Sequence, residues 1–369
     1  MIRIMNTGDI HLGRKFSNYS DELSKKLENA RYETLKNIVV EANNKKCNIF
    51  VITGDLFDKI TMTDLEVLKT IDILREFSGN VLLVLPGNHD HSRIDPWKVF
   101  KENITDGILF LEEQKKYSLK RFGLDVDIYA APCDSKHSAN NNLSWMKEIS
   151  ERNDKNIAIG IAHGAIEGIS PDMTDSYFKM TKNELRDLNM DLWLIGHTHM
   201  PIPKIQANTI SNNKIFNAGT PEPDGFNCNH KGFAWYIEIE NKEKIKAELI
   251  KTGKYYFEEI NAEIVDEKDF EDLLKAIKNN NPENKLIRLN LRGRIEDDLY
   301  NQKNEYYNKI YQIVTYARVI DDDLNLKITE EKIKEEFPEG SYPYLFLNEL
   351  IGEDKTLEIA YELIREVKE

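Results

Sequence analysis

Residues 2–13 read IRIMNTGDIHLG, and this stretch sets a pattern that recurs up to about residue 220. The short apolar run Ile2–Asn6 leads into Gly8-Asp9-Ile10-His11, so polar side chains follow directly on a predicted buried strand. Residues two apart in extended chain point to the same side, so we expect Asp9 and His11 to reach one small site together. The stretch therefore predicts a strand that ends in a functional turn.

Five further apolar runs end in Gly, Asp, Asn or His in the same way. They are Cys47–Thr53, Val81–Leu85, Ile157–Ala162, Met190–Ile195 and Lys214–Asn217. The stretches 21–44 and 62–78 carry Leu, Ile and Val at helical spacing. Because strands and helices alternate, the sequence predicts an α/β fold.

The polar residues at these strand ends carry the chemistry. They are Asp9, His11, Asp55, Asn88, His89, His163, His197 and His199. Ligands of open α/β sheets bind at the carboxyl ends of the strands, and imidazole with carboxylate suits a borderline divalent metal. Each motif alone is also explained by capping and turns, but together they use five of the eight histidines. We interpret the set as one metal site.

The composition excludes several classes of protein. The 369 residues are enough for two domains, and with 40% hydrophobic residues the chain is no disordered protein. No apolar run approaches the ~18 residues that span a bilayer, so we expect no membrane segment. Met1–Met5 lead straight into strand-like sequence, so we expect no signal peptide. Three distant cysteines form no disulfide framework, which favours the cytoplasm.

The net charge of −14 argues against binding of nucleic acid through bulk positive charge. The acidity is concentrated at the C-terminus, where residues 321–369 hold 15 acidic and 6 basic residues, a net of −9. Residues 1–250 hold 36 acidic and 32 basic residues, a net of −4, so the body is close to neutral.

Beyond residue 228 the pattern changes to hairpins and a smaller α+β region. We expect strands at Phe233–Ile239, Ile245–Lys251 and Leu286–Ile295, a strand then a helix within 256–279, and a tyrosine-rich helix over 301–319. The predicted domains are 1–255 (catalytic), 256–325 (a capping domain that contacts DNA) and 326–369 (a helical acidic tail).

The strand-end motifs together resemble the signature of the calcineurin-like metallophosphoesterases. The matching stretches are Gly8-Asp9-Ile10-His11-Leu12-Gly13, Gly54-Asp55-Leu56-Phe57-Asp58, Gly87-Asn88-His89-Asp90, His163-Gly164 and Gly196-His197-Thr198-His199. Ala-Gly-Thr-Pro at 218–221 and Lys231-Gly232 make the chain more similar to the SbcD-type DNA-repair nucleases and their YhaO-like bacterial relatives. The segment LNLRGR at 289–294 looks like the small capping domain of such proteins.

The resemblance implies a two-layer β-sandwich flanked by helices that holds two divalent metal ions. It implies Asp9, His11 and His199 as ligands of one metal, Asn88, His163 and His197 as ligands of the other, and Asp55 as the bridge. Relatives lead us to expect Mn²⁺, although the ligand types also suit Fe²⁺ or Zn²⁺. Two divalent ions beside two aspartates leave a positive site that attracts a phosphodiester.

His89 and Asp58 are the expected catalytic residues beside the metals. His89 is not needed as a ligand and is the candidate to protonate the leaving oxygen. Asp58 resembles the carboxylate that orients this histidine in phosphatase relatives, whereas archaeal and eukaryotic nuclease relatives often have a second histidine there. The alternative for Asp58 is a helix N-cap or a turn acid before Lys59.

Two groups of cations are candidate DNA contacts. Arg14 and Lys15 follow the first motif and could meet a phosphate backbone or lie in a solvated loop. On the strand at 285–295, Arg288, Arg292 and Arg294 share one face, which is either a DNA-guiding stripe or the polar side of a half-buried strand.

These features predict a two-metal phosphodiesterase, an exonuclease or endonuclease acting on DNA. The resemblance implies an SMC-like, SbcC-like ATPase partner bound through the C-terminal tail, where apolar residues recur at helical spacing with breaks at 338–340 and 352–354. The alternative for the tail is that it packs on the protein's own body. The alternatives for the function are a small-molecule or cyclic-nucleotide phosphodiesterase and a DNA-end tethering scaffold. A homodimer stays open.

Overall fold

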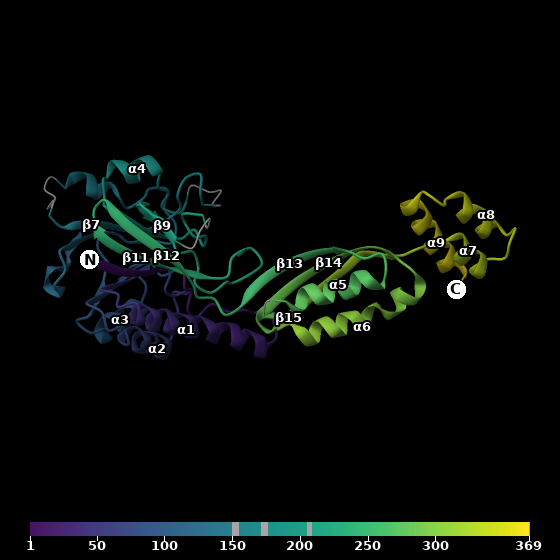
Figure 1. Ribbon diagram of the computed structural model, residues 1–369, viewed down its shortest axis with the longest axis horizontal. Coiled ribbons are helices and arrows are strands. Elements are labelled where there is room, and N and C mark those ends of the chain that lie inside the picture. The colour runs from purple at the N-terminus through teal and green to yellow at the C-terminus, as the bar shows by residue number, and fades with distance from the viewer. Residues whose placement is uncertain (150–154, 171–175, 205–208, 280, 369) are drawn as a thin grey trace. The chain divides into compact units, whose positions relative to one another are not determined.

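A computed structural model of the chain describes residues 1–149, 155–170, 176–204, 209–279 and 281–368. The chain divides into two compact units, Met1–Phe257 and Glu258–Glu369, and each is described by itself (Figure 1). The three-domain division expected from the sequence stays a prediction.

The first unit is built on two β-sheets, the larger with the strand order β4-β3-β2-β1-β11-β12-β9. Strands β1 to β4 are parallel, whereas β11 pairs antiparallel with β1, and β12 pairs antiparallel with β11 and β9. The bounds are β1 Ile2–Thr7, β2 Ile49–Thr53, β3 Val81–Leu85, β4 Ile108–Phe110, β9 Thr209–Ser211, β11 Phe233–Asn241 and β12 Lys244–Lys251.

The second sheet has the strand order β10-β8-β7-β6-β5 and is parallel except for β5. Its strands are β5 Lys116–Ser118, β6 Val126–Ala131, β7 Ile157–His163, β8 Leu192–Gly196 and β10 Ile215–Phe216. The parallel strands of each sheet deliver their carboxyl ends to one edge, which is where the predicted ligands lie.

Helices cover the outer faces of the two sheets. They are α1 Asp21–Asn44, α2 Asp64–Arg75, α3 Pro96–Asn103 and α4 Lys182–Asp187, with the 3₁₀ helix η2 Ser144–Glu148, whereas Leu119 of the 3₁₀ helix η1 Leu119–Phe122 packs into the layer between the sheets. Helix α1 begins after Ser20, whose side chain accepts a hydrogen bond from the Leu23 amide, and α2 begins with a capping box of Thr63 and Glu66. Helices α1, α2 and α3 lie on one side of the sheets and α4 on the other (Figure 1).

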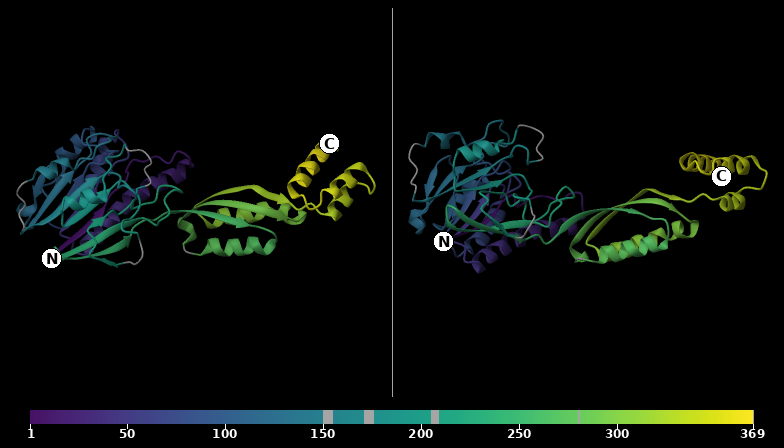
Figure 2. Two further views of the ribbon diagram at one scale, coloured as in Figure 1. Left: turned by 90° about the horizontal axis from the view of Figure 1, so that it is seen from above. Right: turned by 45° about the horizontal axis from the view of Figure 1, so that its top comes forward.

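Three apolar layers hold this unit together. Residues such as Val51 and Ile161 fill the space between the two sheets. Leu35 and Phe100 belong to the layer under α1 to α3, and Leu185 to the layer under α4. The unit is therefore a β-sandwich flanked by helices, as Figure 2 shows from two further directions, and the predicted fold class is confirmed.

The second unit contains a three-stranded sheet with the order β13-β14-β15. Its elements are β13 Tyr256–Glu263, α5 Glu267–Lys278, η3 Pro282–Asn284, β14 Lys285–Ile295, α6 Asp297–Ile313 and β15 Tyr316–Leu326. Helices α5 and α6 lie on one face of the sheet (Figure 1), where Phe270 and Ile310 join the apolar core.

The predicted helix over 301–319 is wrong in its last part. Helix α6 ends at Ile313, and β15 follows as a strand parallel to β14, paired from Leu286 with Tyr316 to Ile295 with Leu326. The strand forms because β14 offers an open edge, and this tertiary pairing overrides the local pattern.

Three short helices complete the second unit: α7 Glu330–Glu336, α8 Tyr342–Glu349 and α9 Asp354–Lys368. Their breaks lie at the predicted stretches 338–340 and 352–354. Ile333, Leu347 and Leu357 form a core shared among the three helices. None of the helices within the described ranges combines the length and apolar content that a bilayer crossing requires.

Candidate metal centre

All seven predicted metal ligands lie at the carboxyl ends of parallel strands. Asp9 and His11 follow β1, Asp55 follows β2, Asn88 follows β3, His163 ends β7, and His197 and His199 follow β8. Six of them are buried or nearly so, and His199 retains a third of its side-chain exposure. Because the two sheets face each other, the two sets of strand ends converge on one place.

The backbone at these strand ends is held in an uncommon conformation. Asp9, His11, Asp55, His197 and His199 all have positive φ angles, between 50° and 97°. Such non-glycine residues each cost of order 1–3 kcal/mol and cluster at sites where the geometry is functional. The strain therefore marks the same residues that the motifs mark.

The first group of donor atoms is formed by Asp9, His11, Asp55 and His199, whose ligand atoms all lie within 4.8 Å of one another. His11 Nε2 lies 3.0 Å from His199 Nε2 and 3.7 Å from Asp55 Oδ2. His199 Nε2 lies 3.9 Å from Asp9 Oδ1. These are the residues predicted for one metal together with the predicted bridge.

The second group joins Asn88, His163 and His197. Asn88 Oδ1 lies 3.0 Å from His163 Nε2 and 3.1 Å from His197 Nδ1. His163 Nε2 is also 3.4 Å from Asp55 Oδ2. Asp55 Oδ2 thus lies next to both groups, which is the position that a bridging ligand requires.

The chemistry of these donors fits bound cations. The main-chain carbonyl of Thr53 lies 2.8 Å from His163 Nδ1 and accepts its hydrogen, so Nε2 offers a lone pair when the ring is neutral. That lone pair faces the Asn88 and Asp55 oxygens, which are also acceptors. Asp55 Oδ2 is buried and has no hydrogen-bond partner among the residues that the structure describes. A divalent cation is the group that satisfies such converging lone pairs.

Burial shapes the ionisation of the histidines. Burial lowers the pKa of His11, and burial followed by the neighbouring His163 ring lowers the pKa of His197 to about 3. These rings are therefore neutral, the form that binds metal. Burial also opposes the charged form of His163, but the Asp55 carboxylate outweighs it and raises the pKa of His163 to about 9. The Asp55 carboxylate therefore favours a positive charge next to His163, and a bound metal ion would supply that charge.

His89 and Asp58, the predicted catalytic residues, lie beside the first group. His89 Nδ1 is 3.4 Å from the Asp58 carbonyl oxygen and 3.9 Å from Asp58 Oδ1. Asp58 Oδ1 is closer to His11 Nδ1, at 3.1 Å. Asp58 lies in a bend, and the N-cap of α2 is Thr63. The carboxylate of Asp58 is thus placed to orient a ligand histidine and His89 together.

Asp90 is a site residue to which the sequence reasoning gave no role. Its buried carboxylate accepts hydrogen bonds from the amides of Gly87, Asp55 and Phe57, at 2.7, 3.2 and 3.0 Å. It therefore ties the turn after β3 to the turn after β2. Burial, with the charge of Asp55, raises the pKa of Asp90 to about 7. Its place in the Gly87-Asn88-His89-Asp90 motif was the available signal.

Asp224 was also missed, and no motif marked it. Its Oδ2 lies 2.8 Å from an Arg14 amino group and 3.8 Å from both His199 Nδ1 and the buried Arg31. Burial would raise the pKa of Asp224, but Arg31 and His199 lower it to about 2. The Asp224 carboxylate therefore lies beside the ring of His199, a predicted ligand, and it forms an ion pair with Arg14.

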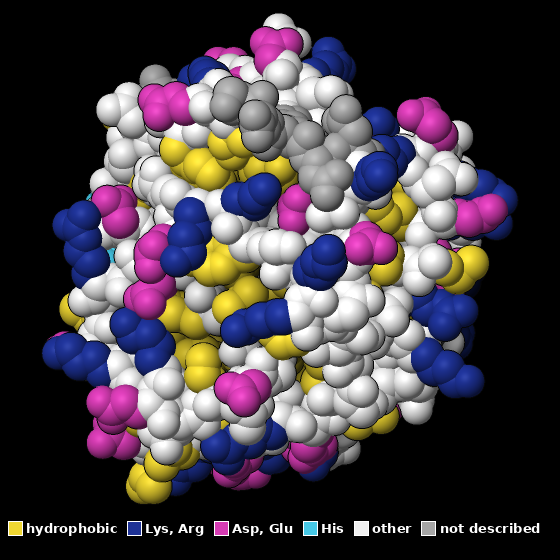
Figure 3. All heavy atoms as spheres, turned by 90° about the vertical axis from the view of Figure 1, so that its left-hand side faces the viewer, with side chains coloured by type: hydrophobic (Ala, Val, Ile, Leu, Met, Phe, Trp, Pro, Cys, Tyr) yellow, Lys and Arg dark blue, Asp and Glu magenta, His cyan; other side chains and the backbone are white. Residues whose placement is uncertain are grey.

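The other predicted DNA-contact cations also have acidic neighbours. Lys15 lies 2.8 Å from Glu28. Arg288, Arg292 and Arg294 lie 3.7, 3.1 and 3.7 Å from the carboxylates of Glu259, Glu263 and Glu358 respectively. Figure 3 shows one face of the molecule, where basic and acidic side chains are both scattered among apolar ones. These pairings leave little unbalanced positive charge at the predicted contacts.

Comparison with known proteins agrees with the geometry of the site. The family model of the calcineurin-like phosphoesterases matches residues 2–201, which is more than half of the chain. An uncharacterised metallophosphoesterase of Bacillus subtilis (strain 168), YhaO, is 23% identical over 206 residues, 54% of this chain and 48% of that protein. The chain thus spans about half the length of this relative.

Among solved structures, the crystal structure of TT1561 from Thermus thermophilus aligns with a TM-score of 0.42 and 9% identity. The alignment covers 68% of this chain and 99% of that one.

Proposed function

Since this chain belongs to the calcineurin-like phosphoesterase family, we propose that it is a two-metal phosphodiesterase that hydrolyses DNA, as an exonuclease or endonuclease. The observation that carries the proposal is the position of Asp55, whose Oδ2 lies within 3.7 Å of donor atoms from both groups of ligands. Family membership supports metal-dependent phosphoester hydrolysis, whereas DNA as the substrate is our proposal.

When bound, two divalent cations, proposed to be Mn²⁺, would neutralise the phosphodiester and polarise it for hydrolysis. Asp9, His11 and His199 would hold one of them and Asn88, His163 and His197 the other. The strained turns hold these side chains in place before substrate arrives, so little reorganisation is needed during the reaction.

His89 supplies the proton in this proposal. Its side chain is about one-third exposed, and its Nδ1 faces the main-chain carbonyl oxygen and the Oδ1 atom of Asp58. When His89 is an imidazolium, its Nδ1 hydrogen points to Asp58 and its Nε2 hydrogen is available to the leaving oxygen. General acid catalysis of this kind contributes ~10²–10⁴-fold to the rate.

One observation favours a second candidate function. All five predicted DNA-contact cations lie beside carboxylates, which suits a small or cyclic-nucleotide phosphodiester better than a long polyanion. Against it, the second unit adds residues 258–369, which a small-molecule enzyme does not need. A DNA-end tethering scaffold is the further alternative.

We also propose that the protein acts as the nuclease subunit of a repair complex with an SMC-like ATPase, bound through α7 to α9. Apolar side chains remain exposed on these helices, among them Tyr342, Leu345 and Leu363 at 74, 55 and 57%. The acidic surroundings would repel DNA and suit a basic helical partner.

The test is a nuclease assay of the full chain with Mn²⁺ on end-labelled duplex, hairpin and single-stranded DNA. Bis(p-nitrophenyl) phosphate and a cyclic nucleotide run in parallel, with His89→Ala as the control. We expect metal-dependent cleavage of DNA that the variant loses. Turnover of the cyclic nucleotide without cleavage of DNA would support the small-molecule phosphodiesterase instead. DNA binding without cleavage would support the DNA-end tethering scaffold.

A further inference from the structure

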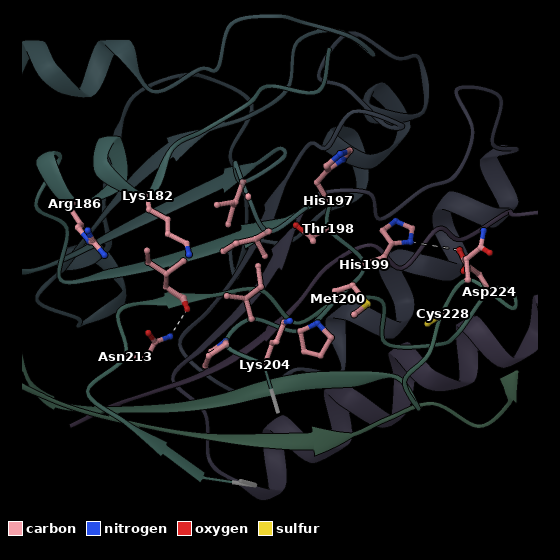
Figure 4. Close-up of a pocket in the computed structure, with 18 residues that line it drawn as sticks. Lys182, Arg186, His197, Thr198, His199, Met200, Lys204, Asn213, Asp224 and Cys228 are labelled. Atoms are coloured by element: carbon pink, nitrogen blue, oxygen red, sulfur yellow. Dashed lines mark hydrogen bonds and ion pairs between the residues drawn. The ribbon is translucent and has the colours of Figure 1, made fainter. Parts of the chain in front are cut away.

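A cavity of about 950 Å³ opens beside the metal centre, within the first unit. Its walls come from the loop after β7, from α4, from the turn after β8 and from the segment that carries Asp224 and Cys228. His197 and His199, two of the predicted metal ligands, line it as well (Figure 4). A substrate group bound in this cavity would lie directly next to the phosphodiester at the metal centre.

One wall of the cavity is apolar. Ile169, Met200, Pro201 and Ile215 contribute to it, and the loop that carries Ile169 is fixed by a 2.9 Å hydrogen bond between the Ser170 and Thr198 hydroxyls. The cavity volume falls in the range of pockets that enclose small ligands, ~300–1,000 Å³. It has room for a planar, largely apolar group such as a nucleobase.

The lining of the cavity also includes three cations. Lys182 and Arg186 lie one helical turn apart on α4, and Lys204 comes from the chain after β8. Figure 4 shows Lys182 and Lys204 directed into the cavity from these separate elements. All three are exposed, and within the described ranges none forms an ion pair with a carboxylate. In this they differ from Arg14, which is bound to Asp224.

From this combination we infer that the cavity binds the nucleotide next to the scissile phosphodiester of a single-stranded or frayed DNA end. The unstacked base lies on the apolar wall, and the next phosphate lies on Lys182, Arg186 and Lys204. The inference rests on the proposed function, and it names the form of DNA that the site accepts. A base must leave the duplex stack to enter, so a single strand enters at lower cost than a paired one.

The test compares Lys182→Ala/Arg186→Ala with the matched control Lys25→Ala/Lys120→Ala. The control residues are exposed lysines on α1 and η1 that likewise form no ion pair within the described ranges. Kinetics are measured with a single-stranded oligonucleotide and with bis(p-nitrophenyl) phosphate, which has neither a base nor a second phosphate. Binding of the oligonucleotide is measured without metal by fluorescence anisotropy.

We expect the cavity variant to raise KM for the oligonucleotide about tenfold and to weaken metal-free binding by a similar factor, with kcat and model-substrate turnover unchanged. The dependence of log affinity on log salt should fall by roughly 0.7 per lost phosphate contact. An abasic nucleotide beside the cleaved bond should raise KM of the wild-type protein.

Two outcomes are distinguishable failures. If wild-type protein cleaves single-stranded DNA but both double variants match it in KM, the cavity inference is overturned and the proposed function survives. If wild-type protein hydrolyses bis(p-nitrophenyl) phosphate but no DNA, the proposed DNA substrate fails and the inference fails with it.

Discussion

At the scale of single residues, Asp55 connects the two groups of donor atoms. Its Oδ2 lies 3.7 Å from His11 Nε2 and 3.4 Å from His163 Nε2. Its Oδ1 accepts a hydrogen bond from the His89 amide, which fixes the carboxylate in the turn. In our proposal, the negative charge at this point would serve two cations at once.

Asp55→Asn is therefore expected to lower the occupancy of both metal sites, because it removes the charge shared between them. We expect at least a ~10-fold loss of metal affinity, measured by elemental analysis after dialysis against limiting metal. Asp106→Asn, at an exposed aspartate, is the control. Two metals per chain with full activity in Asp55→Asn would refute the bridging role.

His89→Ala is expected to keep its metals while turnover of DNA falls ~10²–10⁴-fold, because our proposal assigns His89 as the proton donor beside Asp58 and not as a ligand. The loss should be smaller for bis(p-nitrophenyl) phosphate, whose leaving group needs little protonation. Elemental analysis and kcat for both substrates check this, with the exposed His137→Ala as control. Stoichiometric loss of metal from His89→Ala would instead make His89 a ligand.

The sequence pointed to the side chains that converge at the strand ends more readily than to those that hold them in place. Asp9 and His199 stood in recognisable turns after apolar runs. Asp224 did not, since its role depends on burial beside Arg31 and His199, which lie far from it in the chain. Arg14 was expected to face DNA, but its pairing with Asp224 became visible only in three dimensions.

At the scale of elements, the buried strands of the sandwich and the alternating strands β11, β12 and β14 were predictable, whereas β15 was not. β2 and β3 are short runs of fully buried residues, a pattern that is typical of strands in a parallel sheet. All residues of β15 except Leu324 are partly or fully exposed and three of them are successive aspartates, so its sequence resembles a helix surface as much as a strand. Its partner β14 decides its conformation.

β14 carries an irregularity that offers a test of this unit. The register with β15 shifts between Asn290 and Arg292, and Gly293 follows with φ of +137°. A Cβ at this glycine would collide with the main chain of Ile264. Only glycine therefore allows β14 to continue past the bulge.

Gly293→Ala should destabilise the second unit by about 1–3 kcal/mol through this strain. Hydrogen exchange of residues 285–295 should become faster, whereas Arg292→Ala on the same strand should change it little. All four tryptophans, Trp97, Trp145, Trp193 and Trp235, lie in the first unit, so tryptophan fluorescence on denaturation should be unchanged. Unaltered exchange in β14 would show that the site tolerates a side chain.

At the scale of the whole molecule, the chain combines a phosphoesterase unit with a second unit that has cores of its own. The core of α7, α8 and α9 is formed by residues between Ile328 and Ile364. Arg294 and Asp297 pair with Glu358 and Lys332, which links these helices to β14 and α6 within the same unit. Each of these ion pairs joins a mostly buried side chain to a more exposed one, whereas the three helices share an apolar core among themselves.

Deletion of residues 328–369 is therefore expected to spare metal binding and hydrolysis of bis(p-nitrophenyl) phosphate, because the metal centre lies wholly within the first unit. β15 extends to Leu326, so truncation after residue 327 leaves the sheet of the second unit intact. The truncated protein should lose co-purification with an SMC-like ATPase, since the deleted helices carry the exposed apolar side chains.

The point variant Leu345→Asp/Leu363→Asp makes the same test without truncation. Both side chains are more than half exposed, so the substitutions leave the small core of the three helices in place while they make its outer surface polar. Loss of the partner in both proteins, with metal content and model-substrate turnover retained, is the expected result. Loss of hydrolysis or of solubility in the truncated protein would instead mean that these helices stabilise the enzyme itself. Retention of the partner by both proteins would move the binding surface elsewhere in the chain.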